Sequence, residues 1–131
     1  MKINYKDIVP WGRSFDEYVK MFSLTSDDLN LKILDCGGGP SSFNAEMTKW
    51  GKKVISIDPI YNLFADDIEI RINETYDDVI NQTRVNVDKF IWQNISSVEE
   101  LGHIRMAAMK QFLADYEFQK GGNEILRIIS K

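Results

Sequence analysis

Residues 31–61 read LKILDCGGGPSSFNAEMTKWGKKVISIDPIY, and this stretch decides the fold that the sequence predicts. A short apolar run, Ile33 and Leu34, ends in Asp35 and three glycines. A segment with helical character follows, and a second apolar run ends in another acid, Asp58. This order predicts strand, tight turn, helix and strand. In such an α/β sheet both acids lie at the carboxyl ends of the strands, where ligands bind.

The turn and the second acid have the spacing of a nucleoside site. Gly37 and Gly39 carry no Cβ atom that would keep a ligand away from the backbone, and the following helix points free N–H groups at the same place. Asp58 lies nineteen residues after Gly39, as the numbering shows. At that separation an acid can accept hydrogen bonds from both hydroxyls of a ribose. The stretch therefore predicts a nucleoside-binding βαβ unit.

Two phosphate-binding fingerprints are incomplete in this stretch. The dinucleotide fingerprint requires a third glycine where this chain has Ser42. The phosphate-cradling P-loop requires a lysine, and none follows the glycines in GGPS at 38–41. Both departures argue against a ligand that is bound through its phosphates.

The segment LDCGGGP at 34–40 resembles motif I of the class I S-adenosylmethionine-dependent methyltransferases, and ISID at 55–58 resembles the acidic end of their second strand. The resemblance implies a Rossmann-like, three-layer αβα fold with a mainly parallel sheet in the strand order 3-2-1. It also implies S-adenosyl-L-methionine as the cofactor. A sulfonium cofactor has no pyrophosphate, so it needs neither the third glycine nor the lysine.

The resemblance further implies which residues hold the cofactor. Asp35, Gly37 and Gly39 would hold the amino acid part, and Asp58 the ribose. The other role that the resemblance implies for Asp35 is to hold the glycine turn. Either Ile60 or Tyr61 would cover one face of the adenine, although an apolar residue there fits the core equally well. The complete predicted set is Arg13, Asp35, Gly37, Gly38, Gly39, Pro40, Asp58, Pro59 and Ile60. None of them is assigned as a catalytic acid or base, and no metal site is predicted.

The N-terminal residues 1–30 predict a helical lid. Ser14 and Glu17 have the spacing of a capping box, which predicts a helix from about residue 15 to 22. Trp11 and Arg13 directly precede this helix. One interpretation is a surface lid in which Trp11 packs on the domain. The other is that Arg13 pairs with the carboxylate of the cofactor's methionine part, because a planar guanidinium binds a carboxylate with two hydrogen bonds. Methyltransferases often carry such a helix over the cofactor, and the resemblance lets Tyr18 serve the same site.

The remaining elements follow from periodicity and caps. A helix is expected from Ser41 or Ser42 to Trp50, ended by Gly51. Residues 62–81 favour a helix, although the alternation of isoleucines at 68, 70 and 72 offers a strand. A connection at 83–96, a long helix opened by a capping box at 97–100 and ended by glycines at 121 and 122, and a third strand at 125–129 complete the chain. This predicts one cofactor-binding domain over 1–131, with a βαβ core at 31–131 and a helical insertion at 62–119.

Composition limits the classes of partner. The 131 residues are 44% hydrophobic and 27% charged, as in an ordinary soluble globular domain. The net charge of −4 provides no basic footprint for a nucleic acid, which disfavours that substrate. Cys36 is the one cysteine, so no internal disulfide forms and a reducing compartment is expected. With no apolar run near eighteen residues and no charged-then-apolar leader, the sequence predicts a cytoplasmic protein without a membrane segment.

These observations predict a methyltransferase, or its cofactor-binding part, that methylates an unidentified small-molecule or protein acceptor. The sheet of the resembled family continues after its third strand, and this chain has no residues for the C-terminal half of that sheet. Strand one would then be an exposed edge that invites pairing. We favour the amino-terminal part of a longer enzyme over a homo-oligomer that pairs through this edge.

Two rival functions are weaker. The alternative from a different class is a noncatalytic interaction module that keeps the fold and pairs through its exposed sheet edge. A nicotinamide-dependent oxidoreductase is disfavoured by Ser42 and by the absence of a recognisable hydride-transfer site.

Overall fold

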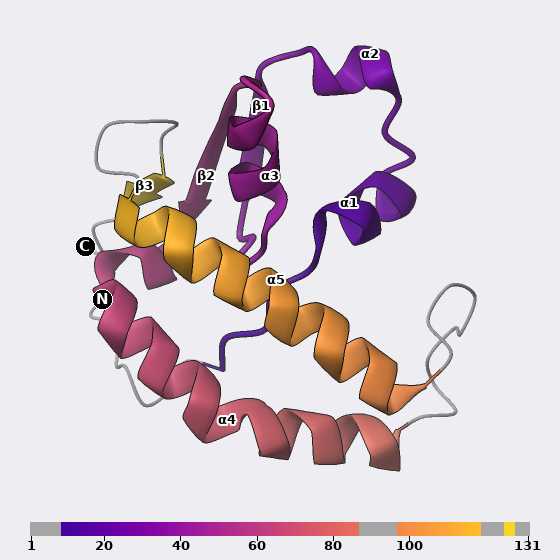
Figure 1. The fold of residues 1–131 in the computed structure, drawn as a ribbon, viewed down its shortest axis with the longest axis vertical. Helices are drawn as coiled ribbons and strands as arrows, with labels where there is room; N and C mark the ends of the chain where they lie inside the picture. The colour runs from indigo at the N-terminus through magenta and orange to yellow at the C-terminus, as the bar shows by residue number, and fades with distance from the viewer. Residues whose placement is uncertain (1–8, 87–96, 119–124, 128–131) are drawn as a thin grey trace.

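The computed structural model describes residues 9–86, 97–118 and 125–127. Along the chain, two short helices precede the first strand, and two long helices follow the second strand and precede the third (Figure 1). The order is α1 (Phe15–Met21), α2 (Ser26–Leu29), β1 (Ile33–Cys36), α3 (Phe43–Lys49), β2 (Val54–Asp58), the 3-10 turn η2 (Pro59–Asn62), α4 (Ala65–Val85), α5 (Val98–Phe118) and β3 (Ile125–Arg127).

The strands form one parallel sheet in the order β1-β2-β3. Asp35 of β1 lies opposite Ser56 of β2, and Cys36 lies opposite Ile57. Since both strands run in the same direction, the acids that close them reach the same end of the sheet. The expected mixed α/β class with a parallel sheet is confirmed.

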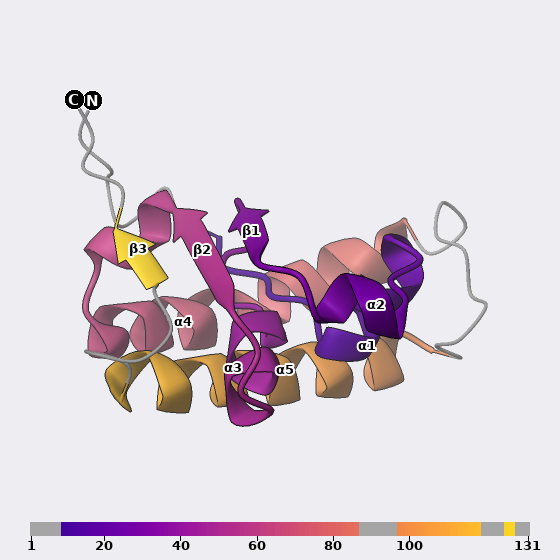
Figure 2. The ribbon, with the colours of Figure 1, turned by 90° about the horizontal axis from the view of Figure 1, so that it is seen from above.

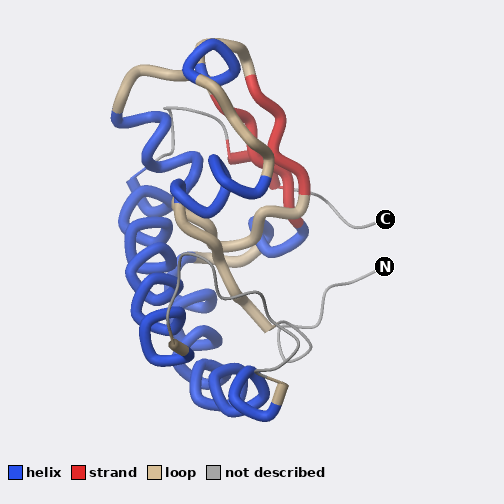
Figure 3. The backbone as a smooth tube through the Cα atoms, turned by 90° about the vertical axis from the view of Figure 1, so that its right-hand side faces the viewer, coloured by secondary structure: helices blue, strands red, loops and turns tan. Residues whose placement is uncertain are grey.

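Helices α3, α4 and α5 lie on one face of the sheet (Figures 2 and 3). The alternation along the strands agrees with this arrangement: Val54 and Ser56 are each only 1% exposed, whereas Leu34 is 61% exposed. The described residues thus form two layers, and the second helical layer of the expected three-layer architecture is not among them. Along its outer edge, β1 has no strand partner within the parts of the chain that the structure describes.

One predicted capping box forms completely, the serine half of a second is present, and the cap predicted for α3 does not form. Ser14 and Glu17 form the predicted capping box of α1. The Oγ atom of Ser97 accepts the amide of Glu100 over 3.0 Å at the start of α5. Ser42 occupies the N-cap position of α3, but its side chain makes no cap hydrogen bond there, which corrects the expected cap. Its backbone has φ −90° and ψ 2° rather than the extended conformation of the other caps, so the hydroxyl is not directed at the helix amides.

Residues 65–85 form one continuous helix, so the helical interpretation of this segment is confirmed and the strand alternative is wrong. The helix buries Ile68 and Ile72 at helical spacing. It also extends through residues 83–85, which were expected to begin a connection. Residues 87–96 of that connection, the glycines at 121 and 122 and the last two residues of the predicted third strand lie outside the described residues.

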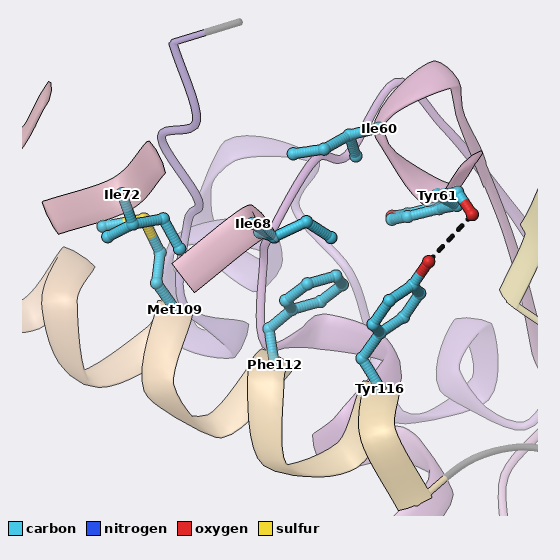
Figure 4. Close-up of a cluster of buried hydrophobic side chains, with 7 residues drawn as sticks. All are labelled: Ile60, Tyr61, Ile68, Ile72, Met109, Phe112 and Tyr116. Atoms are coloured by element: carbon cyan, nitrogen blue, oxygen red, sulfur yellow. Dashed lines mark hydrogen bonds between the residues drawn. The ribbon is translucent and has the colours of Figure 1, made fainter. Parts of the chain in front are cut away.

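The main core joins η2 to the two long helices (Figure 4). Its buried members are Ile60, Tyr61, Ile68, Ile72, Met109, Phe112 and Tyr116. The Tyr116 hydroxyl donates to the carbonyl oxygens of Tyr61 and Leu63, in both cases over 2.8 Å. This packing fixes the turn that follows β2, and with it the position of residues 59 and 60. Neither long helix, nor any shorter one in the described parts, has the length and apolar character needed to cross a bilayer.

Candidate functional site

A cavity of about 270 Å³ lies where the carboxyl ends of β1 and β2 meet the N-terminal segment. Its volume is close to the lower end of the range for small-molecule sites. Every predicted site residue except Asp35 lines it, together with residues that were not in the predicted set. The first group is Arg13, Gly37, Gly38, Gly39, Pro40, Asp58, Pro59 and Ile60, and the second is Val9, Pro10, Trp11 and Tyr18.

The glycine turn has a conformation that its residue types permit. Gly37 and Gly39 have φ values of 71° and 58°, in the left-handed region that side chains disfavour. The Gly37 amide donates to the carbonyl oxygen of Ile57 over 2.7 Å, which anchors the start of the turn to β2. The Tyr61 hydroxyl donates to the carbonyl oxygen of Gly39 over 2.9 Å. Both ends of the turn are thus held by hydrogen bonds within the chain.

Asp58 connects this turn to the end of β2. Its Oδ2 atom accepts the amide of Gly39 over 2.9 Å, and its Oδ1 atom accepts the amide of Ile60 over 2.8 Å. A carboxylate has about four acceptor positions, so each oxygen can accept one further hydrogen bond. Asp58 can thus organise the turn and still bind hydroxyl groups of a ligand.

Asp35 lies beneath the turn rather than in the cavity wall. A Cβ atom built on Gly38 would lie 2.5 Å from Oδ2 of Asp35 and 2.8 Å from the hydroxyl oxygen of Tyr18. Glycine at this position therefore lets the turn pass directly over the acid. A contact between Asp35 and the amino acid part of a cofactor remains a prediction.

Asp35 belongs to a largely buried polar network. The Tyr18 hydroxyl lies 3.2 Å and 3.3 Å from its two carboxylate oxygens, and Ser56 donates to it over 3.5 Å. Burial raises the pKa of Asp35 above its ordinary value, and the nearby Asp58 charge adds to the rise, while the Tyr18 and Ser56 hydrogen bonds oppose it. Burial likewise raises the pKa of Tyr18 to about 12, so this hydroxyl is protonated at neutral pH.

The N-terminal segment touches the glycine turn through its backbone. A Cβ atom on Gly12 would lie 2.0 Å from the carbonyl oxygen of Pro40, so only glycine permits the observed approach. The Ser42 amide also donates to the carbonyl oxygen of Arg13 over 3.0 Å. These contacts bring Trp11 into the cavity wall, whereas the sequence predicts only that Trp11 packs on the domain. A glycine directly before Arg13 was the available signal, but its packing partner is 28 positions away along the numbering of the chain.

The cavity combines opposite charges on different elements. Arg13, an exposed residue, precedes α1, whereas Asp58 closes β2. Such a wall can bind a ligand that has both hydrogen-bond donors and an anionic group. Among the described residues, no three His, Cys, Asp or Glu side chains are grouped so that they could hold a metal ion.

The sequence is similar to that of an uncharacterized protein of Methanocaldococcus jannaschii. The two are 40% identical over 116 residues, which cover 88% of this chain and 52% of the relative. The chain thus spans about half the length of the curated relative that it matches. No protein-family model and no solved structure matches the chain.

Proposed function

We propose that this chain binds S-adenosyl-L-methionine and is a methyltransferase, or the cofactor-binding part of one. The observation that carries the proposal is the joined turn and acid: the Gly39 amide is bonded to the Asp58 carboxylate, and both line a cavity that also contains Arg13. The order of three parallel strands supports the Rossmann-like fold that the proposal requires. The cytoplasm is the proposed location, supported by the free thiol of Cys36.

The residues of the cavity fit the parts of this cofactor. The left-handed glycines leave the backbone of the turn open to a ligand, since a Cβ atom on Gly37 would meet nothing within 4 Å. Asp58 has acceptor positions for the ribose hydroxyls, and Arg13 suits the carboxylate. Ile60 lines the cavity but is only 4% exposed and belongs to the main core, so its contact with the adenine stays a prediction. Tyr61 does not fit that last role, because it is 1% exposed and its hydroxyl is bonded to Gly39.

In the proposed reaction this chain contributes orientation and the exclusion of water. When bound, the sulfonium cofactor supplies an electrophilic methyl carbon with a good leaving group. Arg13 and Asp58 would fix the two ends of the bound molecule, and the wall formed by Trp11 would limit access of water. No residue of the cavity is assigned as a catalytic acid or base. The acceptor, a small molecule or a protein, remains unassigned.

The test is isothermal titration of the folded chain with S-adenosylhomocysteine, with NADH as the competing ligand class. Saturable one-to-one binding of S-adenosylhomocysteine and no binding of NADH are expected. The reverse order of affinities would favour the nicotinamide alternative. A folded chain that binds neither ligand at millimolar concentration would overturn the proposal.

A second candidate is a noncatalytic module that acts through its sheet, including self-association through β1. The observation that favours it is the uncovered face and edge: Leu34 is 61% exposed, Cys36 is also exposed, and the parallel sheet has helices on one face in the described residues. Parallel sheets are usually covered on both faces. The two candidates make different predictions for a charge placed at Leu34.

A further inference from the structure

Arg105 of α5 makes a forked, partly buried ion pair with Glu17 of α1. Its Nε atom donates to both carboxylate oxygens, over 2.9 Å and 3.0 Å, and its Nη2 atom lies 2.7 Å from Oε1. The residue is only 9% exposed. Its guanidinium carbon also lies 5.5 Å from the ring centroid of Trp11, which allows a cation–π contact. Arg105 therefore contacts Trp11, which precedes Arg13 in the sequence, and Glu17, which follows it.

The Glu17 carboxylate also binds the segment that contains Arg13. Its Oε2 atom accepts the amide of Ser14 over 2.9 Å, while the Ser14 hydroxyl accepts the amide of Glu17 over 3.2 Å. One carboxylate thus binds both Arg105 and the residue that follows Arg13. We call residues 9–14 the lid segment.

The lid segment is fixed to the cavity at its other side by backbone contacts. The carbonyl oxygen of Arg13 accepts the Ser42 amide, and Gly12 lies against Pro40. Arg105 thus holds the lid segment from α5. Pro40 and Ser42, which lie between β1 and α3, hold it from the other side. A forked Arg–carboxylate pair fixes orientation as well as distance, which a single point charge does not.

We propose that Arg105 is a positioning residue for the cavity. By holding Trp11 and the Glu17 cap, it sets the place of the lid segment and so directs Arg13 toward the carboxylate of the ligand. That Arg13 meets a ligand carboxylate rests on the proposed function. That Arg105 holds the lid segment does not.

The test in the presence of ligand compares two nucleosides that differ in the amino acid part. Arg105→Met keeps the length of the side chain and removes the fork. S-adenosylhomocysteine, which carries the carboxylate, should bind about tenfold more weakly to this variant, the size expected when a charged hydrogen bond is misplaced. 5′-Methylthioadenosine, which lacks the carboxylate, should lose less than about twofold on the same scale. An equal loss for both ligands would show a general structural defect and would overturn the positioning role.

A second measurement needs no ligand. Amide exchange followed by NMR at Ser14 and Ser42 reports both attachments of the lid segment, because these amides donate to Glu17 and to the Arg13 carbonyl oxygen. Exchange at both amides should be at least about tenfold faster in Arg105→Met, because the form in which the lid segment has come away from the cavity should be that much more populated. Unchanged exchange at both amides would overturn the inference. If the wild-type chain binds neither nucleoside, the proposed function fails, and the exchange rates alone decide the role of Arg105.

The matched control is Arg84→Met, which removes a 2.8 Å ion pair between Arg84 of α4 and Glu99 of α5. This pair is exposed and includes no residue of the lid segment, so neither the affinities nor the two exchange rates should change. Arg105→Lys is the second variant should Arg105→Met not fold. It retains the charge without the fork, and the same selective loss for S-adenosylhomocysteine is expected.

Discussion

The backbone amide of Gly39 donates a hydrogen bond to the carboxylate of Asp58 over 2.9 Å, across nineteen positions of the chain. This bond joins the turn after β1 to the end of β2. The glycine turn and the acid, from which the sequence predicts a ligand site, are therefore directly connected. The acid that we expect to bind a ribose therefore also holds the turn that we expect to bind the rest of the ligand.

Replacing Asp58 by Ala should impair both stability and binding. The change leaves the amides of Gly39 and Ile60 without their acceptor, so we expect a loss of about 1–3 kcal/mol in the free energy of unfolding. The affinity for S-adenosylhomocysteine should fall by at least about tenfold, since a charged acceptor is lost. Denaturant unfolding and calorimetric titration measure the two effects. The exposed Asp66 of α4 provides the control, because Asp66→Ala should leave the affinity unchanged.

Replacing Gly12 by Ala should displace the lid segment. The new Cβ atom would lie 2.0 Å from a backbone oxygen of Pro40, which cannot move as a flexible side chain could. We expect a cost of about 1–3 kcal/mol in stability, together with weaker ligand binding. Gly51→Ala is the comparison, because Gly51 has φ 72° with nothing near its Cβ position. It should cost about 1 kcal/mol through backbone strain and spare the affinity. Equal affinities for the two variants would contradict the close approach of Gly12 to the turn.

Asp35 should make the stability of the protein depend on pH. Because burial raises its pKa in the folded state above the ordinary value of 3.8, the folded protein holds this proton more tightly than the unfolded chain. The free energy of unfolding should therefore fall as pH rises from about 3.8 through the folded pKa, and this contribution should then stay constant. Asp35→Asn removes the contribution. Urea unfolding at a series of pH values measures it, and an identical pH profile for this variant would count against the assignment.

Tyr18→Phe should shift the same titration upward. The hydrogen bond from Tyr18 lowers the pKa of Asp35, so its removal leaves burial less opposed. We expect a higher pKa for Asp35 and a fall in stability that continues to higher pH than in the wild-type chain. Carboxyl NMR titration of Asp35 measures the shift directly, and a lower pKa in the variant would contradict the observed network.

Leu34→Glu distinguishes the two candidate functions. Leu34 is exposed, so the stability of the monomer should change by no more than about 0.5 kcal/mol. If the chain acts by pairing through β1, the wild-type protein should associate as its concentration rises, and the variant should remain monomeric, because like charges across the paired strands would repel each other. Sedimentation velocity measures this difference. A wild-type chain that is monomeric throughout, with unchanged nucleoside binding in the variant, would exclude self-association.

The sequence by itself determined the βαβ unit and the two acids at one end of its strands. These features depend on local rules: apolar runs predict strands, glycines permit the turn, and the cap formed by Ser14 and Glu17 starts α1. Parallel strands then bring Asp35 and Asp58 to the same edge without further information. Local rules also predicted a helix at residues 62–81, because an apolar stripe sustained at helical spacing outweighs three alternating isoleucines, but not that this helix extends to residue 85.

Only the tertiary structure decided how these parts meet. It placed Asp35 beneath Gly38, Gly12 against Pro40, and Arg105 on Glu17, a residue 88 positions earlier in the chain. It also left Leu34 on an uncovered face of the sheet in the described residues. The physical reason is that these outcomes depend on how the chain folds back on itself: which segments approach the turn after β1, which helix lies beside α1, and which face of the sheet the helices cover. No periodicity or cap in a single segment records which distant residue its side chains will meet.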